Sequence, residues 1–61
     1  MKTARDYFNM ACRDLGLEHP ATIGIGRCID AAREGRILAG QATDNAKIIY
    51  NKAMANIMKA E

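Results

Sequence analysis

Apolar residues recur at helical spacing in three stretches of the chain, and the first stretch has clear end signals. Thr3 can cap a helix, and Asp6 three residues later completes a capping-box pattern. Gly16 stands where a left-handed C-terminal cap belongs. These signals predict a helix over residues 4–15, with Leu17 folding back onto its apolar face. That face consists of Ala4, Phe8, Ala11 and Leu15.

The second apolar stretch predicts a helix that begins between Pro20 and Ile25 and ends at Gly35. Its start is left open because Gly24 and Gly26 each cost about 1 kcal/mol inside a helix. The predicted buried face consists of Ile25, Cys28, Ile29 and Ala32. The predicted solvent face consists of Arg27, Asp30, Arg33 and Glu34.

The third stretch predicts a short extra turn over residues 36–39 and then a helix capped by Thr43, Asp44 or Asn45. The predicted inward face consists of Ala46, Ile49, Tyr50, Ala53, Ile57 and Ala60. Three apolar side chains are left outside this face: Ile48, Met54 and Met58.

Taken together, the patterns predict an all-α fold: a small three-helix bundle with a short extra turn before the last helix. The 61 residues are expected to form a single helical domain, residues 1–61, with room for only a thin core. A rival interpretation pairs residues 36–41 with residues 46–50 as a β-hairpin, because isoleucine and tyrosine favour strands. The alanines and methionines that follow favour the helix.

Charge and cysteine content narrow the class of protein. The net charge of +2 is too small to demand a polyanionic partner. No apolar run is long enough to span a bilayer, so no membrane partner is expected. No signal-peptide pattern is visible, and Cys12 and Cys28 are therefore expected as free thiols in a cytoplasmic protein.

No motif for catalysis, metal or cofactor binding stands out, and the sequence predicts a protein that is not an enzyme. The only histidine, His19, lies in a predicted loop, and Cys12 and Cys28 lie on predicted core faces. These three residues lack the fourth ligand and paired spacing of a zinc site. Gly24-Ile25-Gly26 has no preceding strand and no third glycine, so a dinucleotide loop is not expected. We expect no catalytic residue, cofactor, metal or small-molecule substrate.

About 20 residues around Gly16 locally resemble helix-turn-helix proteins. Cys12 is the small residue four before Gly16, leucines flank the turn, and Ile25 lies where the second helix anchors inward. The resemblance breaks at Thr22, where such proteins usually bury an apolar side chain. It implies an alternative function in DNA binding or regulation. Nucleic-acid contacts would then come from Thr22, Arg27, Arg33 and Arg36.

The surplus of apolar side chains on the last helix indicates a different function. A bundle this small cannot bury them all, and methionine adapts well to irregular partner surfaces. The leading hypothesis is a non-enzymatic protein-interaction module that forms a homodimer or docks on another protein. Its interface would contain Ile48, Met54 and Met58.

Overall fold

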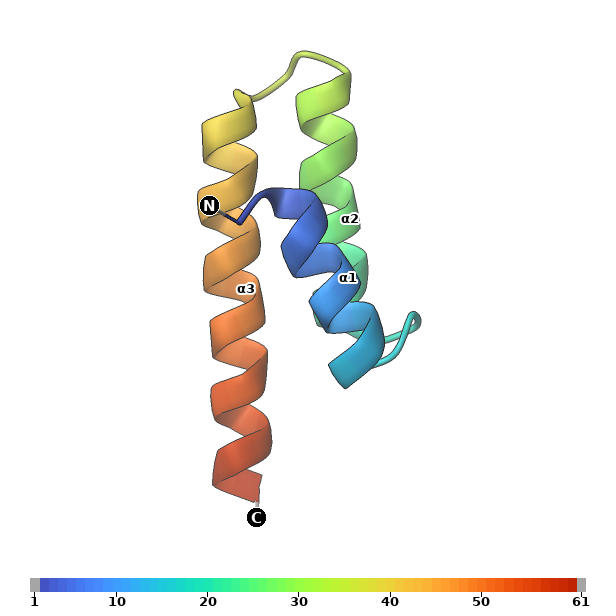
Figure 1. Cartoon of the computed structure of the whole chain (residues 1–61), viewed down its shortest axis with the longest axis vertical. Coiled ribbons are helices and arrows are strands. Elements are labelled where there is room, and N and C mark those ends of the chain that lie inside the picture. Colours follow the sequence, from blue (N-terminus) through green and yellow to red (C-terminus); the bar gives the residue numbers. More distant parts are fainter. Residues whose placement is uncertain (1, 61) are drawn as a thin grey trace.

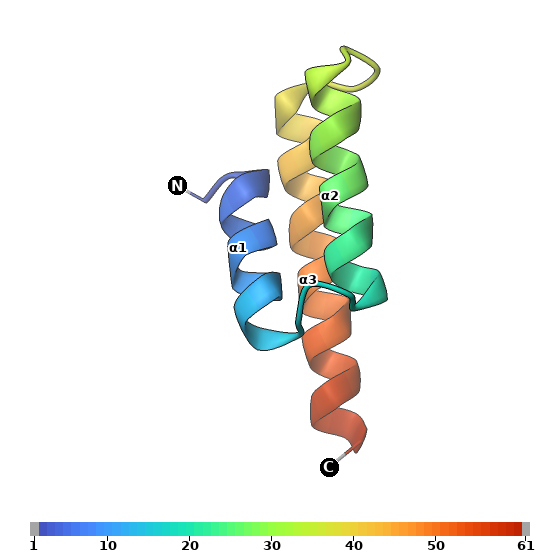
Figure 2. The same ribbon diagram turned by 90° about the vertical axis from the view of Figure 1, so that its right-hand side faces the viewer.

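The computed structural model describes residues 2–60, and of Ala60 only the helical backbone. It contains three helices, α1 (Ala4–Asp14), α2 (Pro20–Arg33) and α3 (Ala39–Ala60). Figures 1 and 2 show α1 and α2 side by side, running in opposite directions, with α3 packed along both. The predicted all-α three-helix bundle is confirmed. None of the helices in residues 2–60 combines the length and hydropathy needed to cross a membrane.

The ends of α1 follow the sequence signals closely. The Thr3 side chain accepts a hydrogen bond from the Asp6 N–H (3.3 Å), and Asp6 accepts one from the Thr3 N–H (2.8 Å), which completes the capping box. Gly16 adopts a φ of +96°, and its N–H donates to the Ala11 carbonyl (3.1 Å) and the Cys12 carbonyl (3.2 Å). These bonds satisfy carbonyls that the end of the helix leaves without partners. The Leu17 side chain is 67% exposed, so the prediction that it folds back onto the apolar face of α1 was wrong.

Helix α2 begins at Pro20 and accommodates both glycines because helices approach each other at these points. A Cβ on Gly26 would lie 3.3 Å from Cε1 of Phe8 in α1. A Cβ on Gly24 would lie 3.6 Å from Cδ1 of Ile49 in α3. Packing of the Phe8 and Ile49 side chains against the two glycines thus offsets the low helix propensity of glycine.

The C-terminal end of α2 is a Schellman motif. Gly35 has a φ of +80°, its N–H donates to the Ala32 carbonyl (3.1 Å), and the Arg36 N–H donates to the Ala31 carbonyl (2.9 Å). These two bonds satisfy carbonyls that the end of the helix leaves without partners. The predicted stop at Gly35 is confirmed to within one residue, because Arg33 is the last helical residue and Glu34 the cap.

The predictions for the start of the last helix were wrong. Residues 36–38 form a non-helical connection instead of the extra turn, and α3 starts at Ala39, upstream of every predicted cap. The Gln41 side chain accepts a hydrogen bond from the Leu38 N–H at 3.1 Å, which supplies the cap. Thr43 lies inside the helix and donates to the Ala39 carbonyl. The continuous helix also rules out the β-hairpin.

The core is small and built mainly from alanine. The buried apolar residues in the described chain are Ala4, Ala11, Ile25, Ala42, Ala46 and Ala53. Partly buried side chains that pack against this core are Tyr7, Phe8, Leu15, Cys28, Ile29, Ala32, Ile37, Ile49 and Tyr50. The predicted inner faces of α1 and α2 are confirmed. Ala42 was missed because it precedes the predicted start of the last helix.

Candidate protein interface on α3

Two of the three predicted interface side chains are strongly exposed. Ile48 is 60% exposed and Met58 is 73% exposed, whereas Met54 is half-buried at the edge of the packed face. The prediction that α3 carries more apolar side chains than the bundle buries is thus confirmed for Ile48 and Met58. Whether these residues contact a partner stays a prediction.

The three residues do not share one face of α3. An α-helix turns by about 100° per residue, so Met54 and Met58 lie one turn apart on the same side. Ile48 lies about 120° around the helix from Met54 by the same geometry. The structure therefore groups Met54 with Met58 and places Ile48 on a separate part of the surface.

The C-terminal end of α3 extends past the ends of α1 and α2 (Figure 1). Ala53 is still buried, but Ile57, one turn later on the predicted inward face, is 38% exposed. The inward position of Ile57 was predicted from periodicity, but no neighbouring helix reaches far enough to cover it fully. The predicted inward side chain of Ala60 lies outside the described residues.

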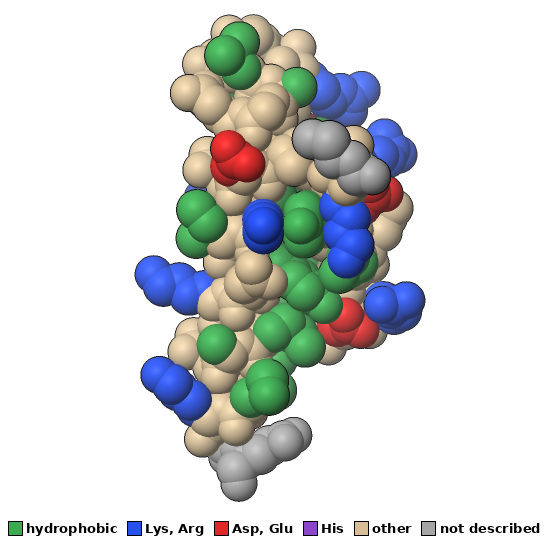
Figure 3. Space-filling model, turned by 60° about the vertical axis from the view of Figure 1, so that its left-hand side comes forward, with side chains coloured by type: hydrophobic (Ala, Val, Ile, Leu, Met, Phe, Trp, Pro, Cys, Tyr) green, Lys and Arg blue, Asp and Glu red, His purple; other side chains and the backbone are tan. Residues whose placement is uncertain are grey.

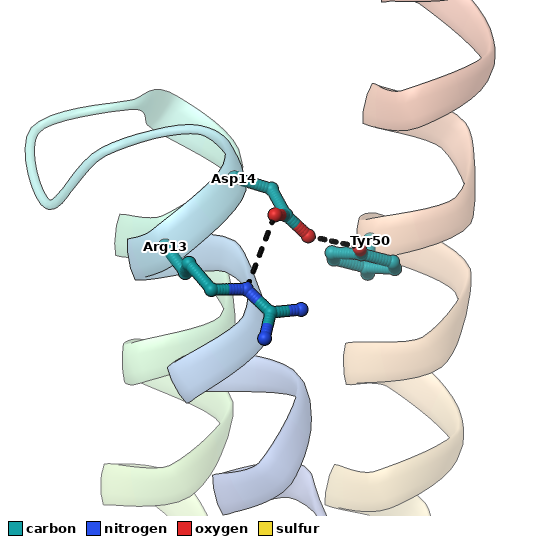
Figure 4. A network of polar contacts seen from close by, with 3 residues as sticks. All are labelled: Arg13, Asp14 and Tyr50. Carbon is teal, nitrogen blue, oxygen red and sulfur yellow. Dashed lines mark hydrogen bonds and ion pairs between the residues drawn. The ribbon is translucent and has the colours of Figure 1, made fainter.

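A tyrosine pair joins α1 to α3 immediately before this overhanging end. The rings of Tyr7 and Tyr50 lie 6.1 Å apart between centroids and are tilted by 50°. The Lys2 ammonium lies 5.9 Å from the centroid of the Tyr7 ring, within range of a cation–π interaction. The Tyr50 hydroxyl donates to Oδ2 of Asp14 at 2.6 Å (Figure 4). Tyr50 thus contacts the first turn of α1 through Tyr7 and its last residue through Asp14, which fixes α1 against the middle of α3.

The same carboxylate also interacts with its sequence neighbour. Nε of Arg13 lies 3.3 Å from Oδ1 of Asp14, so the two oxygens of Asp14 have different partners (Figure 4). The hydrogen bond from Tyr50 lowers the pKa of Asp14, and the Arg13 guanidinium lowers it further. The same bond raises the pKa of the Tyr50 hydroxyl, because ionisation would remove the donated proton.

Sequence reasoning missed this link between α1 and α3. Spacing assigned Tyr50 to the inward face of its helix and gave Asp14 no role. A pair separated by 36 positions in the sequence leaves no periodic signal. Only the packing of α1 against α3 brings the two groups together.

Hydrophobic side chains form a band on this side of the molecule. Figure 3 shows them gathered along the seam between α3 and α1 and continuing onto the C-terminal end of α3, with basic and acidic side chains beside them. We call this surface the α1/α3 band and define it by Tyr7, Tyr50, Met54 and Met58. An apolar band with a charged margin has the layout of a protein-interaction surface.

The four residues predicted to contact nucleic acid are not all available for such contacts. Thr22 is fully buried, and its hydroxyl donates to the Gly16 carbonyl at 2.8 Å, so it cannot contact a nucleic acid. Arg27 and Arg33 are exposed, and Arg36 is paired with Glu34 at 2.7 Å. A helix-turn-helix unit crosses its helices at a wide angle, whereas α1 and α2 run side by side (Figure 2).

The three candidate metal ligands serve local structure. His19 caps α2, with Nδ1 accepting the Ala21 N–H at 3.1 Å, and Cys28 packs against the core. Cys12 and Cys28 are both free thiols and half-buried. Within residues 2–60, no three His, Cys, Asp or Glu side chains lie close enough to hold a metal ion.

The segment Gly24-Ile25-Gly26, considered above as a dinucleotide loop, has a structural role instead. Gly24 and Gly26 lie inside α2, so the segment is not a phosphate-binding loop.

Comparison of the chain with protein-family models, with curated proteins and with solved structures gives no match.

Proposed function

We propose that this chain is a non-enzymatic protein-interaction module that self-associates through the α1/α3 band. The observation that carries the proposal is the exposure of Met58 on an end of α3 that extends past the other two helices. Met54 lies one turn before it and links it to the tyrosine pair.

The energetics of a small domain favour covering this band. Burying one large apolar side chain stabilises by about 1.5–3 kcal/mol. A small domain has a total stability on the order of 5 kcal/mol, so burying one such side chain is a sizeable contribution. A two-fold axis would double each contact, because the same patch is used on both copies.

The α3 surface also supplies the rim of such an interface. Lys47 and Lys59 are exposed on the helix and can remain in solvent while the methionines are buried. Lysine stems cover apolar surface while their ammonium groups stay hydrated. The tyrosines add rigid aromatic area, which is enriched at protein interfaces.

Sedimentation equilibrium at micromolar protein concentration tests the proposal. We expect at least a dimer, and Met58→Glu should shift it to a monomer because the carboxylate would be desolvated in the interface. The melting temperature of the wild-type protein should rise with concentration, whereas that of the variant should not.

The matched control is Asn45→Glu. This substitution places the same charge on an exposed position of α3, on the opposite side of the helix from Met54, and should leave the dimer intact. Ile48→Glu maps whether the interface extends to the third predicted residue. A wild-type monomer at every concentration tested, with a melting temperature that Met58→Glu does not change, would contradict self-association.

A further inference from the structure

A second surface, at the opposite end of the bundle, has a different chemical character. Helices α2 and α3 extend beyond the start of α1, so part of their inner surface is not covered by α1 (Figure 1). A groove of about 510 Å³ lies there, within the size range of small-molecule sites. Its aliphatic lining comes from all three helices: Ala4, Ile29, Ala32, Ala39 and Ala42.

Among the described residues, the charged ones that line this groove are Arg5 from α1 and Arg33 from α2, and none of the lining residues is a carboxylate. The ion pairs among the described residues use Arg13 and Arg36 and leave these two guanidinium groups without a carboxylate partner. Arg5 and Arg33 also line the adjoining depression between α1 and α2. Asp30 lines that depression but not the groove, and it forms no ion pair with either arginine.

The polar groups nearest the groove already have partners within the protein. The Thr3 hydroxyl is bonded to Asp6 in the capping box, and the Thr43 hydroxyl donates to the Ala39 carbonyl. Apart from the two arginines, an uncharged polar ligand would therefore find few free side-chain hydrogen-bonding groups along the aliphatic walls. The lining instead complements a molecule with an apolar body and one negative end.

We propose that this groove binds an aliphatic carboxylate, with the alkyl chain on the floor formed by Ile29, Ala32 and Ala42 and the carboxylate held by Arg5 and Arg33. Guanidinium groups form charge-assisted, bidentate hydrogen bonds with carboxylates. Two like charges beside an apolar surface also attract an anion more strongly than either does alone. The alkyl chain gains from leaving water, and the carboxylate exchanges hydration for hydrogen bonds from two guanidinium groups.

Titration of the full chain with sodium decanoate, below its micellar concentration, tests the site. Methyl resonances of Ile29, Ala32 and Ala42 should shift saturably in NMR spectra. The double variant Arg5→Gln, Arg33→Gln should weaken binding by about tenfold or more, because both charge-assisted contacts are lost. Glutamine keeps the helix propensity close to that of arginine, so the fold should persist.

Two controls make the result specific. Arg27→Gln removes an exposed guanidinium from α2 outside the groove and should leave decanoate binding unchanged. Decanol has the same chain without the charge and should bind more weakly than decanoate. The proposal is overturned if decanol binds as tightly, or if Arg27→Gln weakens binding as much as the double variant. It also fails if the shifts map to Ile57 and Met58, which would indicate adsorption to the other exposed apolar surface.

Discussion

The Tyr50 hydroxyl donates a 2.6 Å hydrogen bond to Asp14, and this bond joins the middle of the longest helix to the last residue of the shortest one. Helix α1 has only eleven residues, so it is too short to be stable alone in water. Its place in the bundle depends on Ala4 and Ala11 in the core and on this link at its end.

We predict that Tyr50→Phe lowers stability less than Tyr50→Ala. Phenylalanine keeps the ring that packs against Tyr7 and loses only the hydrogen bond, whereas alanine loses both. The melting temperature of each variant, measured by circular dichroism at neutral pH, checks this order. Equal losses for the two variants would mean that the ring contributes nothing beyond its hydroxyl.

The hydrogen bond also predicts a dependence of stability on pH. The pKa of Asp14 lies below its ordinary 3.8 in the folded protein, so its contribution is present above that value and is lost as the pH falls through the folded pKa. The pKa of Tyr50 lies above its ordinary 10.0, so its contribution is present below that value and is lost as the pH rises through the folded pKa.

Urea unfolding of the wild-type protein and Tyr50→Phe across this range gives the measurement. The difference in unfolding free energy between the two proteins should be constant between the ordinary pKa values of 3.8 and 10.0 and should shrink below and above this range. A difference that stays the same in strong acid would show that the bond does not depend on the Asp14 charge.

Thr22 provides a test of buried polar structure. Its hydroxyl is fully buried and donates to the Gly16 carbonyl at 2.8 Å, which fixes the turn between α1 and α2. Thr22→Val keeps the shape and removes the donor, so we expect a loss of about 1–2 kcal/mol. Chemical denaturation measures it. Thr43→Val is the control, because its hydroxyl bonds only within its own helix, and its loss should be smaller.

The two glycines of α2 should respond differently to alanine. Gly24→Ala places a methyl group at ordinary contact distance from Ile49 (3.6 Å) and gains helix propensity, so it should stabilise by up to about 1 kcal/mol. Gly26→Ala places the methyl 3.3 Å from the Phe8 ring, which has to move. Its gain should be smaller or become a loss. Thermal unfolding of both variants decides the order, and a larger gain for Gly26→Ala would contradict the packing described above.

Local signals determined much of the fold from the sequence alone. The capping box at Thr3, the left-handed glycines at positions 16 and 35 and the period of the apolar residues act within one or two turns. They therefore predict that the segments are helical and which faces pack inward. The two glycines also place the C-terminal ends of α1 and α2 to within one residue. The surplus apolar residues on α3 were visible for the same reason.

The tertiary structure decided what depends on distant contacts. It paired Asp14 with Tyr50, buried Thr22, and left Ile57 and Met58 on an end of α3 that the other helices do not fully cover. The start of α3 at Ala39 was missed for a different reason, because its cap is a local bond from the Leu38 N–H to the Gln41 side chain that the sequence patterns did not reveal. Periodicity reports which side of a helix is apolar. The lengths and relative positions of the neighbouring helices determine how much of that side is buried.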